Sequence, residues 1–142
     1  MVESGKRKIG IFGGSFDPPH KGHLKISEIA LKKLALDKLY WCITKKNPFK
    51  NKTLFSLPDR IKKCKLLTVK IKKIEVKYFE NKIKSNSSID LIEYLIKKNK
   101  KNEFFFIIGS DNLIDLHKWK NWKLLTKLLK IVVFSRKDYD IK

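Results

Sequence analysis

Acidic residues, cysteines and long apolar runs are all scarce in this sequence. Its two cysteines, Cys42 and Cys64, lie far apart and form no CxxC pair, which argues against a disulfide framework or a cysteine-based metal centre. We expect both to be buried, unreactive thiols. No apolar run approaches the roughly 20 residues of a membrane-spanning helix, and the polar N-terminus lacks the apolar segment of a signal peptide. The sequence therefore predicts a cytoplasmic protein with no membrane partner.

The shortage of acidic residues gives the chain a strong positive charge. Lys and Arg number 34 against 14 Asp and Glu, which gives a formal net charge of +20. A charge of this size can mark a protein that binds nucleic acid. Most of these cations are lysines spread over every segment, and neither an aromatic RNA-binding stripe nor a helix-turn-helix pattern accompanies them. We therefore expect solvated lysines, no nucleic-acid partner, and a field that attracts small anionic substrates.

The hydrophobic pattern alternates between strand-like and helix-like segments. Strands are predicted at 8–12, 38–44, 71–79, 104–108 and 131–134, and helices at 21–36, 58–68, from 87 or 88 to 98, 112–116 and 122–129. Ser87 or Ser88 is the expected N-cap of the third helix. Such alternation predicts a parallel sheet with helices on both faces. The chain is thus expected to form one domain over residues 1–142, with a Rossmann-like three-layer α/β/α fold around a mostly parallel five-stranded sheet.

Ligands of such sheets bind beyond the carboxyl ends of the strands. The chemistry is therefore expected at 13–23, 44–50, 109–111 and 135–136, each of which follows a predicted strand. The first of these segments reads GGSFDPPHKGH and joins a strand to a helix. Gly13 and Gly14 lack a Cβ atom, so a phosphate can approach the backbone. The helix N-terminus is expected to add unpaired N–H groups, and Ser15 a hydroxyl donor.

Two histidines lie at the start of the same predicted helix. His20 and His23 are three positions apart, so both can face one bound phosphate group. Gly22 is expected to leave room between them for another group. A histidine pair can also bind a metal, but no third ligand of the HExxH type is evident, and we expect no metal held by the protein.

The GGSFDPPHKGH segment resembles the GGxFDPxHxGH signature of nucleotidyltransferases, most closely that of bacterial nicotinate-nucleotide adenylyltransferases. The resemblance extends over most of the chain. It continues in the second-strand loop, the FIIGSDNL segment, the tryptophan region and the last strand, which are residues 39–50, 106–113, 117–122 and 132–136.

The resemblance implies an activity. ATP and nicotinate mononucleotide would be the partners, with Mg²⁺ accompanying ATP. The phosphate of the mononucleotide would attack the α-phosphorus of ATP. Nicotinate adenine dinucleotide and pyrophosphate would form without a covalent enzyme intermediate. Catalysis would rest on positioning and electrostatic stabilisation, in part by a protonated imidazole.

The resemblance also implies residue roles. The catalytic residues are His20, His23 and Lys50, the lysine as a triphosphate clamp. ATP would be bound by Gly13, Gly14, Ser15, Phe16, His20, Gly22, His23, Gly109, Asp111 and Arg136. The nicotinate nucleotide would be bound by Ser87, Trp119 and Lys120, with Trp119 stacked on the nicotinate ring.

Two departures from the family pattern stand out. The family's Ser-Tyr-Thr-x-x-Thr stretch reads SNSSID here, over residues 85–90. The family's C-terminal phosphate-binding motif Ser-Ser/Thr-x-Ile-Arg is absent from the 142 residues.

Other functions stay open at this point. Pantetheine-phosphate adenylyltransferases and cytidylyltransferases share the first turn, although they usually have threonine at the position of His20 or lack the GSDN and Trp119 regions. A basic nucleic-acid-binding module is the alternative from another class. The sequence leaves the oligomeric state open, a homo-oligomer included, and does not decide between nicotinate and nicotinamide mononucleotide.

Overall fold

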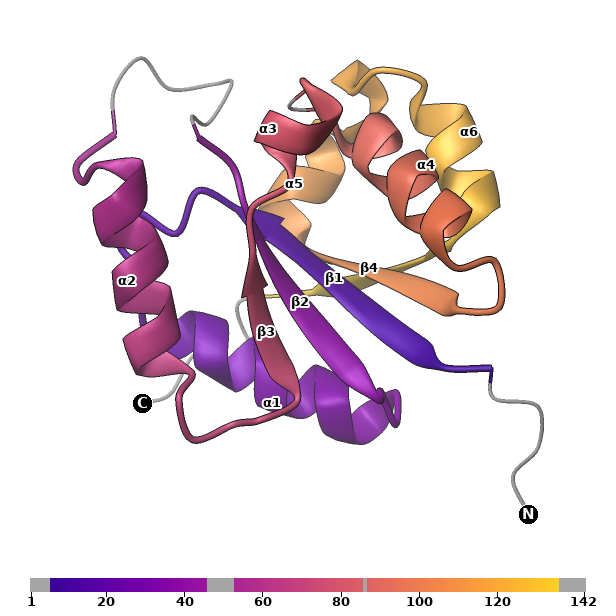
Figure 1. The fold of residues 1–142 in the computed structure, drawn as a ribbon. Coiled ribbons are helices and arrows are strands. Elements are labelled where there is room, and N and C mark those ends of the chain that lie inside the picture. Colours follow the sequence, from indigo (N-terminus) through magenta and orange to yellow (C-terminus); the bar gives the residue numbers. More distant parts are fainter. Residues whose placement is uncertain (1–5, 46–52, 86, 136–142) are drawn as a thin grey trace.

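A computed structural model describes residues 6–45, 53–85 and 87–135, without the side chains of residues 111 and 112. Strands and helices alternate along the chain (Figure 1). Within these residues no helix is both long and apolar enough to cross a membrane. The strands are β1 (Lys8–Gly14), β2 (Lys38–Ile43), β3 (Ile74–Lys77), β4 (Glu103–Gly109) and β5 (Lys130–Phe134). The helices are α1 (Lys21–Lys33), α2 (Leu57–Leu67), α3 (Glu80–Ile83), α4 (Ser88–Lys98), α5 (Ser110–Ile114), the 3₁₀ turn η1 (Leu116–Lys118) and α6 (Trp122–Leu128).

The five strands form one sheet in the order β3-β2-β1-β4-β5, and every neighbouring pair is parallel. The predicted α/β class is therefore confirmed, and the sheet is wholly parallel. From β1 the chain winds outward to β2 and β3, then returns to the other side of β1 for β4 and β5. The strand order thus reverses between β1 and β4, the position where open α/β sheets bind ligands.

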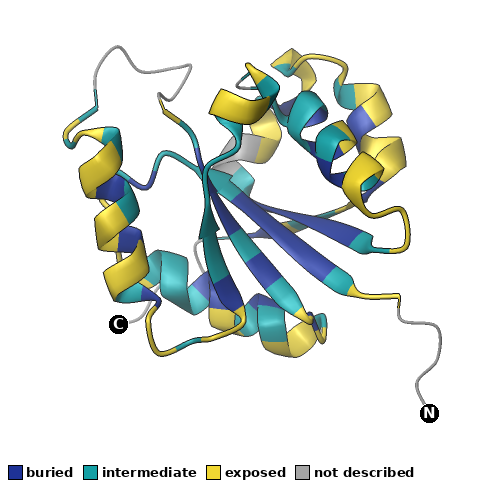
Figure 2. Cartoon of the chain, viewed as in Figure 1, coloured by how far each residue is buried: buried dark blue, intermediate teal, exposed yellow. Residues whose placement is uncertain are grey.

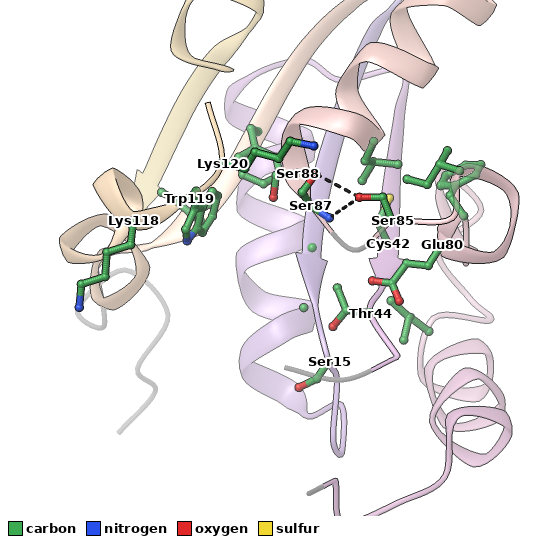
Figure 3. Close-up of a pocket in the computed structure, with 18 residues that line it drawn as sticks. Ser15, Cys42, Thr44, Glu80, Ser85, Ser87, Ser88, Lys118, Trp119 and Lys120 are labelled. Atoms are coloured by element: carbon green, nitrogen blue, oxygen red, sulfur yellow. Dashed lines mark hydrogen bonds between the residues drawn. The ribbon is translucent and has the colours of Figure 1, made fainter. Parts of the chain in front are cut away.

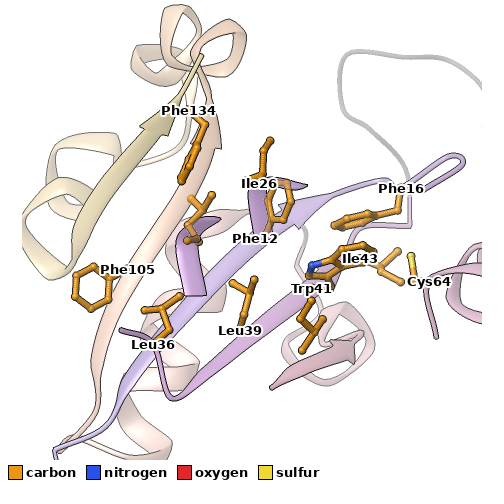
Figure 4. Packing of buried hydrophobic residues seen from close by; sticks show 13 residues of the cluster. Phe12, Phe16, Ile26, Leu36, Leu39, Trp41, Ile43, Cys64, Phe105 and Phe134 are labelled. Atoms are coloured by element: carbon orange, nitrogen blue, oxygen red, sulfur yellow. The ribbon is translucent and has the colours of Figure 1, made fainter. Parts of the chain in front are cut away.

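Helices cover both faces of the sheet, with a hydrophobic core under each (Figures 1 and 2). One core lies under α1 and α2 and includes the fully buried Trp41 of β2 (Figure 4). The other lies under α4 and α6 and includes Phe106 of β4. Cys42 and Cys64 are buried and free, and burial raises the pKa of each thiol to about 12. Both thiols are therefore unreactive near neutral pH, as predicted.

Several element boundaries differ from the sequence-based prediction. Helix α1 ends at Lys33 rather than residue 36, because Ala35 takes a left-handed conformation with φ of 51° and Leu36 N–H donates back to Leu31. Strand β3 covers only Ile74–Lys77, since a turn precedes it, and the four-residue helix α3 follows. Of the two predicted candidates, Ser87 is the N-cap of α4, and its side chain accepts from Asp90 N–H.

Candidate functional site

A cavity of about 580 Å³ lies at the carboxyl edge of the sheet, where the strand order reverses (Figure 3). Its floor comes from the ends of β1, β2 and β4, and its walls from α3, the start of α4 and the segment after η1. The lining residues are Gly13, Gly14, Ser15, Cys42, Ile43, Thr44, Phe79, Glu80, Ile83, Ser85, Ser87, Ser88, Leu91, Phe106, Ile108, Lys118, Trp119 and Lys120.

A hydrogen-bonded polar group forms one side of the cavity. Ser85 Oγ donates to Asp90 Oδ2 at 2.6 Å and lies 3.2 Å from Ser87 Oγ, while Ser87 N–H donates to Ser85 Oγ at 3.1 Å (Figure 3). These serine contacts, and after them Lys120, lower the pKa of the Asp90 carboxyl. Lys120 Nζ lies 3.3 Å from Asp90 Oδ2. The ammonium is therefore held beside the cavity as a cation that an anionic ligand can reach.

An aromatic wall and a carboxylate face each other across the cavity. Trp119 lines the cavity and stands nearly perpendicular to Phe106, with ring centroids 5.8 Å apart. On the other side Glu80 accepts from Lys45 N–H at 2.9 Å, next to Thr44 (Figure 3). Burial raises the pKa of the Glu80 carboxyl. The cavity thus combines a stacking surface, a cation and a hydrogen-bond acceptor.

The two histidines cap the N-terminus of α1. His20 is the N-cap, and its Nδ1 accepts from Gly22 N–H at 3.0 Å; His23 Nδ1 accepts from His20 N–H at 3.0 Å. A neutral imidazole that accepts at Nδ1 carries its proton on Nε2. Both rings can therefore offer an Nε2–H donor. The expectation that the helix amides are unpaired is wrong for Gly22, because an imidazole already occupies its N–H.

The ring of His23 packs among aromatic side chains. Its centroid lies 3.9 Å from that of His20, 4.7 Å from Phe16 and 5.9 Å from Trp41. No room remains between the two imidazoles, contrary to the expectation for Gly22. Burial, and next the charge of His20, lower the pKa of His23 to about 3. In the free protein His23 is therefore a neutral donor near pH 7, whereas the protonated imidazole was expected beside a bound triphosphate and stays a prediction.

A chain of buried hydrogen bonds fixes the first turn of α1 to the sheet. Trp41 Nε1–H donates to Ser27 Oγ at 2.8 Å, and Ser27 Oγ donates to the carbonyl oxygen of His23 at 2.8 Å. Ser27 is fully buried. The position of His23 is thus set by β2 as well as by its own helix.

Comparison with known proteins gives concordant results. The cytidylyltransferase-like family model matches residues 11–142. A protein of Pelagibacter ubique (strain HTCC1062), named as a probable nicotinate-nucleotide adenylyltransferase, is 52% identical over 96% of this chain and 76% of its own length. The chain belongs to the nicotinate-nucleotide adenylyltransferases of the cytidylyltransferase-like family.

Further members of the adenylyltransferase family agree. A protein of Agrobacterium fabrum (strain C58 / ATCC 33970) with the same name is 40% identical over 90% of this chain and 68% of its own length. The solved structure of Plasmodium falciparum nicotinic acid mononucleotide adenylyltransferase complexed with NaAD superposes with a TM-score of 0.77. It is 20% identical to this chain and covers 96% of it and 68% of that structure, which supports the common fold.

Two groups of the residues predicted for this adenylyltransferase come together in the structure. Gly13, Gly14 and Ser15 share one cavity with the three residues predicted for the nicotinate side, Ser87, Trp119 and Lys120. The histidines instead contact aromatic residues of the core under α1 and α2. The cavity is lined by Cys42, Phe106 and Ile108 of the other core. Apart from Ile43, which belongs to the core under α1 and α2, the cavity and the histidines therefore lie on opposite faces of the sheet, and both adjoin the end of β1.

Other predicted residues of this adenylyltransferase are placed differently. Phe16 is 2% exposed and stacks on Trp41 with centroids 4.8 Å apart, so its side chain belongs to the core and only its backbone is left for a ligand. Gly109 ends β4 opposite Phe134 and does not line the cavity. Lys50 and Arg136 lie outside the described residues, and so does the side chain of Asp111.

Sequence reasoning missed several residues that line the cavity of this adenylyltransferase. Thr44 falls within the predicted ligand segment 44–50, but no motif singles out its side chain. Glu80 belongs to α3, whose four residues are too few to show a helical period. Ser85 was visible only as part of the altered SNSSID stretch. Their contributions depend on which strands neighbour one another, and the residue pattern of a single segment does not report this.

The depressed pKa of His23 predicts a pH dependence of stability. Between pH 6.5, the ordinary value, and about 3, the unfolded chain binds a proton at His23 that the folded protein does not, so the free energy of unfolding falls as pH falls. We expect it to be about 1 to 2 kcal/mol lower at pH 5 than at pH 7.5 from this residue. Urea unfolding of wild type and His23→Gln at both pH values measures the effect. The drop in the free energy of unfolding between pH 7.5 and pH 5 should be larger in wild type than in His23→Gln. An equal drop in the two proteins would contradict a buried neutral His23.

Proposed function

We propose that this chain transfers the adenylyl group of ATP to nicotinate mononucleotide, forming nicotinate adenine dinucleotide and pyrophosphate in NAD biosynthesis. The observation that carries the proposal is the cavity in which Gly13–Ser15 faces Trp119 and Lys120. A flat pyridine ring suits the indole face, and its carboxylate suits the ammonium of Lys120. The relatives named as probable nicotinate-nucleotide adenylyltransferases support the same reaction.

The two faces of the sheet suggest how the substrates meet. The mononucleotide would occupy the cavity, with its phosphate beside the backbone of Gly13 and Gly14. ATP would lie toward His20 and His23, whose Nε2–H groups donate to its phosphates. The attacking phosphate oxygen and the α-phosphorus then come together at the end of β1. Proximity and preorganised donors supply the catalysis, and no side chain needs to form a covalent bond.

Mg²⁺ fits this proposal as a companion of ATP. In phosphoryl-transfer sites it is commonly held by substrate phosphates and water with few protein ligands. In the described part of the chain no three His, Cys, Asp or Glu side chains come close enough to hold an ion. The ion would neutralise charge on the departing pyrophosphate, while the histidines hold the phosphates. Lys50, Gly109, Asp111 and Arg136 stay proposed ATP contacts on the family resemblance.

A direct assay tests the function. Purified protein, ATP and Mg²⁺ are mixed with nicotinate mononucleotide, nicotinamide mononucleotide or phosphopantetheine in parallel, and pyrophosphate and the dinucleotide are measured. We expect product with a pyridine mononucleotide, the acid form preferred because Lys120 offers it a cation. Product from phosphopantetheine alone would contradict the proposal and favour the pantetheine-phosphate reaction.

The excess of positive charge calls for a parallel binding test. Polynucleotide binding that weakens steeply with salt but survives His20→Ala and His23→Ala, with no ATP binding at all, would favour the nucleic-acid module instead. We propose that the reaction takes place in the cytoplasm, in keeping with two buried and unpaired thiols. A single domain over residues 1–142 remains part of the proposal.

A further inference from the structure

A buried arginine connects several segments at the carboxyl edge of the sheet. Arg60, in the first turns of α2, is 1% exposed. Its Nη1 donates to the carbonyl oxygens of Ser15 at 2.9 Å and Thr44 at 2.7 Å, and its Nη2 donates to that of Lys45 at 2.6 Å. Its Nε donates to the carbonyl oxygen of Phe55 at 3.1 Å. One guanidinium therefore joins the segment after β1, the end of β2 and the residues before α2.

These contacts hold backbone that lines the cavity or borders it. Ser15 and Thr44 both line the cavity. Thr44 N–H donates to Gly14 O at 2.9 Å, and Lys45 N–H donates to Glu80 at 2.9 Å. The N–H and C=O groups of residues 44 and 45 are thus all bonded, and Arg60 supplies both bonds to the carbonyls. The ladder between β1 and β2 sets the separation at Gly13 and Gly14, and Arg60 sets it for Ser15, just beyond the strand.

Burial of this charge has an energetic cost that the contacts only partly offset. Among the described residues Arg60 forms no ion pair, and the four groups that accept its hydrogen bonds are neutral carbonyl oxygens. An apolar residue of similar size would avoid the desolvation of a buried cation. Only the planar fork of an arginine can donate to four carbonyls at once. The retained charge also favours an anion at the adjacent Ser15 backbone.

We propose that Arg60 is a positioning residue for adenylyl transfer, which holds the Ser15 backbone at a fixed separation from Thr44 and Lys45. The inference rests on the proposed function, since the reacting phosphates are expected at the end of β1. Arg60 itself touches no substrate. It acts through the carbonyls that it holds, and its positive charge adds to the attraction for a triphosphate.

Two variants and a control test the role. Arg60→Lys keeps the charge but loses the fork, and Arg60→Ala loses both; Lys62→Ala removes an exposed cation from the same helix. We expect kcat/KM for ATP to fall about tenfold in Arg60→Lys and further in Arg60→Ala, because displacements of about 1 Å can cost up to 100-fold. The KM for nicotinate mononucleotide should change much less, because Arg60 holds Ser15, a predicted ATP contact, and bonds to none of the predicted mononucleotide contacts Ser87, Trp119 and Lys120. Lys62→Ala should match wild type.

Chemical rescue separates positioning from simple destabilisation. Guanidinium ion, added to Arg60→Ala well below denaturing concentrations, should restore part of kcat/KM for ATP, whereas urea at the same concentration should not. If Arg60→Ala does not fold, Arg60→Lys is assayed below its melting temperature. A fall in kcat/KM for ATP with a nearly unchanged KM for nicotinate mononucleotide then supports the positioning role. Wild-type kinetics in Arg60→Lys, or equal losses for both substrates without rescue, would overturn the proposal.

Binding of α,β-methylene ATP keeps this test separate from the proposed function. It is measured by calorimetry for wild type and both Arg60 variants, without any turnover. An inactive wild type would contradict the proposed reaction alone, while weaker analogue binding by Arg60→Lys would still support Arg60. Equal binding by wild type and Arg60→Lys in an inactive protein would overturn both.

Discussion

Replacing His23 with alanine should lower kcat about 100-fold, the effect of removing one preorganised donor from a developing negative charge. The reason lies in the geometry of the free protein. Nδ1 of His23 accepts from His20 N–H, so the proton is on Nε2. The depressed pKa keeps the ring neutral near pH 7. His23 would therefore act as a fixed N–H donor that needs no charge of its own before ATP binds.

The control for this experiment must preserve the helix cap. Alanine at position 23 also leaves His20 N–H without its acceptor, and loss of a cap costs about 1 kcal/mol of stability. Glutamine at the third helical position can accept from the N-cap N–H, as in an ordinary capping box. His23→Gln should thus melt near wild type and still lose most of the rate, because its amide does not reproduce the Nε2–H position. A rate close to wild type in both variants would remove His23 from the mechanism.

The sheet and the first turn could be predicted because short-range signals determine them. The buried strands are continuous apolar runs and the longer helices show a helical apolar period, so these elements and their order could be predicted, whereas the four-residue α3 could not. The N-cap of α4 was predicted as Ser87 or Ser88, and the structure has Ser87. The histidine spacing placed both rings at one helix start, where the structure has them. The parallel topology followed from the alternation of strands and helices.

The boundary of β1 could not be read from the sequence in the same way. Gly13 and Gly14 suggested a turn, but they continue the strand because they pair with Cys42 and Ile43 of β2. A Cβ atom at Gly13 would come no closer than 3.9 Å to the Cys42 carbonyl oxygen, so there is space on its cavity side. The residues that pair with these glycines lie 29 positions further along the chain, so the pairing is a tertiary effect on local conformation.

The division of the site between two faces was also hidden in the sequence. Phe16 stands within the motif, yet its left-handed backbone, with φ of 50°, accompanies a ring buried against Trp41. The same core packs His23 on that face, while Trp119 and Ser87 line the cavity on the other. A linear motif gives the order of its residues but not the side of the sheet that each one faces. The capping role of both imidazoles was likewise missed, because histidine is not among the usual capping residues.

Replacing Trp119 with alanine should raise the KM for nicotinate mononucleotide about 10- to 100-fold and leave kcat little changed. Stacking of a flat ring on an aromatic side chain contributes about 1 to 3 kcal/mol, and a contact made equally in the ground and transition states changes KM alone. The Trp119 backbone is anchored by its N–H, which donates to Leu116 O at 3.0 Å, and its ring rests against Phe106. The indole is therefore preorganised for stacking. Steady-state kinetics with each substrate varied in turn will measure how much the indole contributes to binding of the mononucleotide.

Two aromatic substitutions complete this test. Trp119→Phe keeps a smaller flat surface and should recover most of the affinity. Trp122→Phe alters a neighbouring tryptophan that packs against the core under α4 and α6 and does not line the cavity, so its KM should match wild type. The KM for ATP should stay constant throughout, since we propose that ATP lies toward His20 and His23 rather than beside Trp119. A parallel rise in the KM for ATP, or an unchanged KM for the mononucleotide in Trp119→Ala, would show that the pyridine ring does not stack on Trp119.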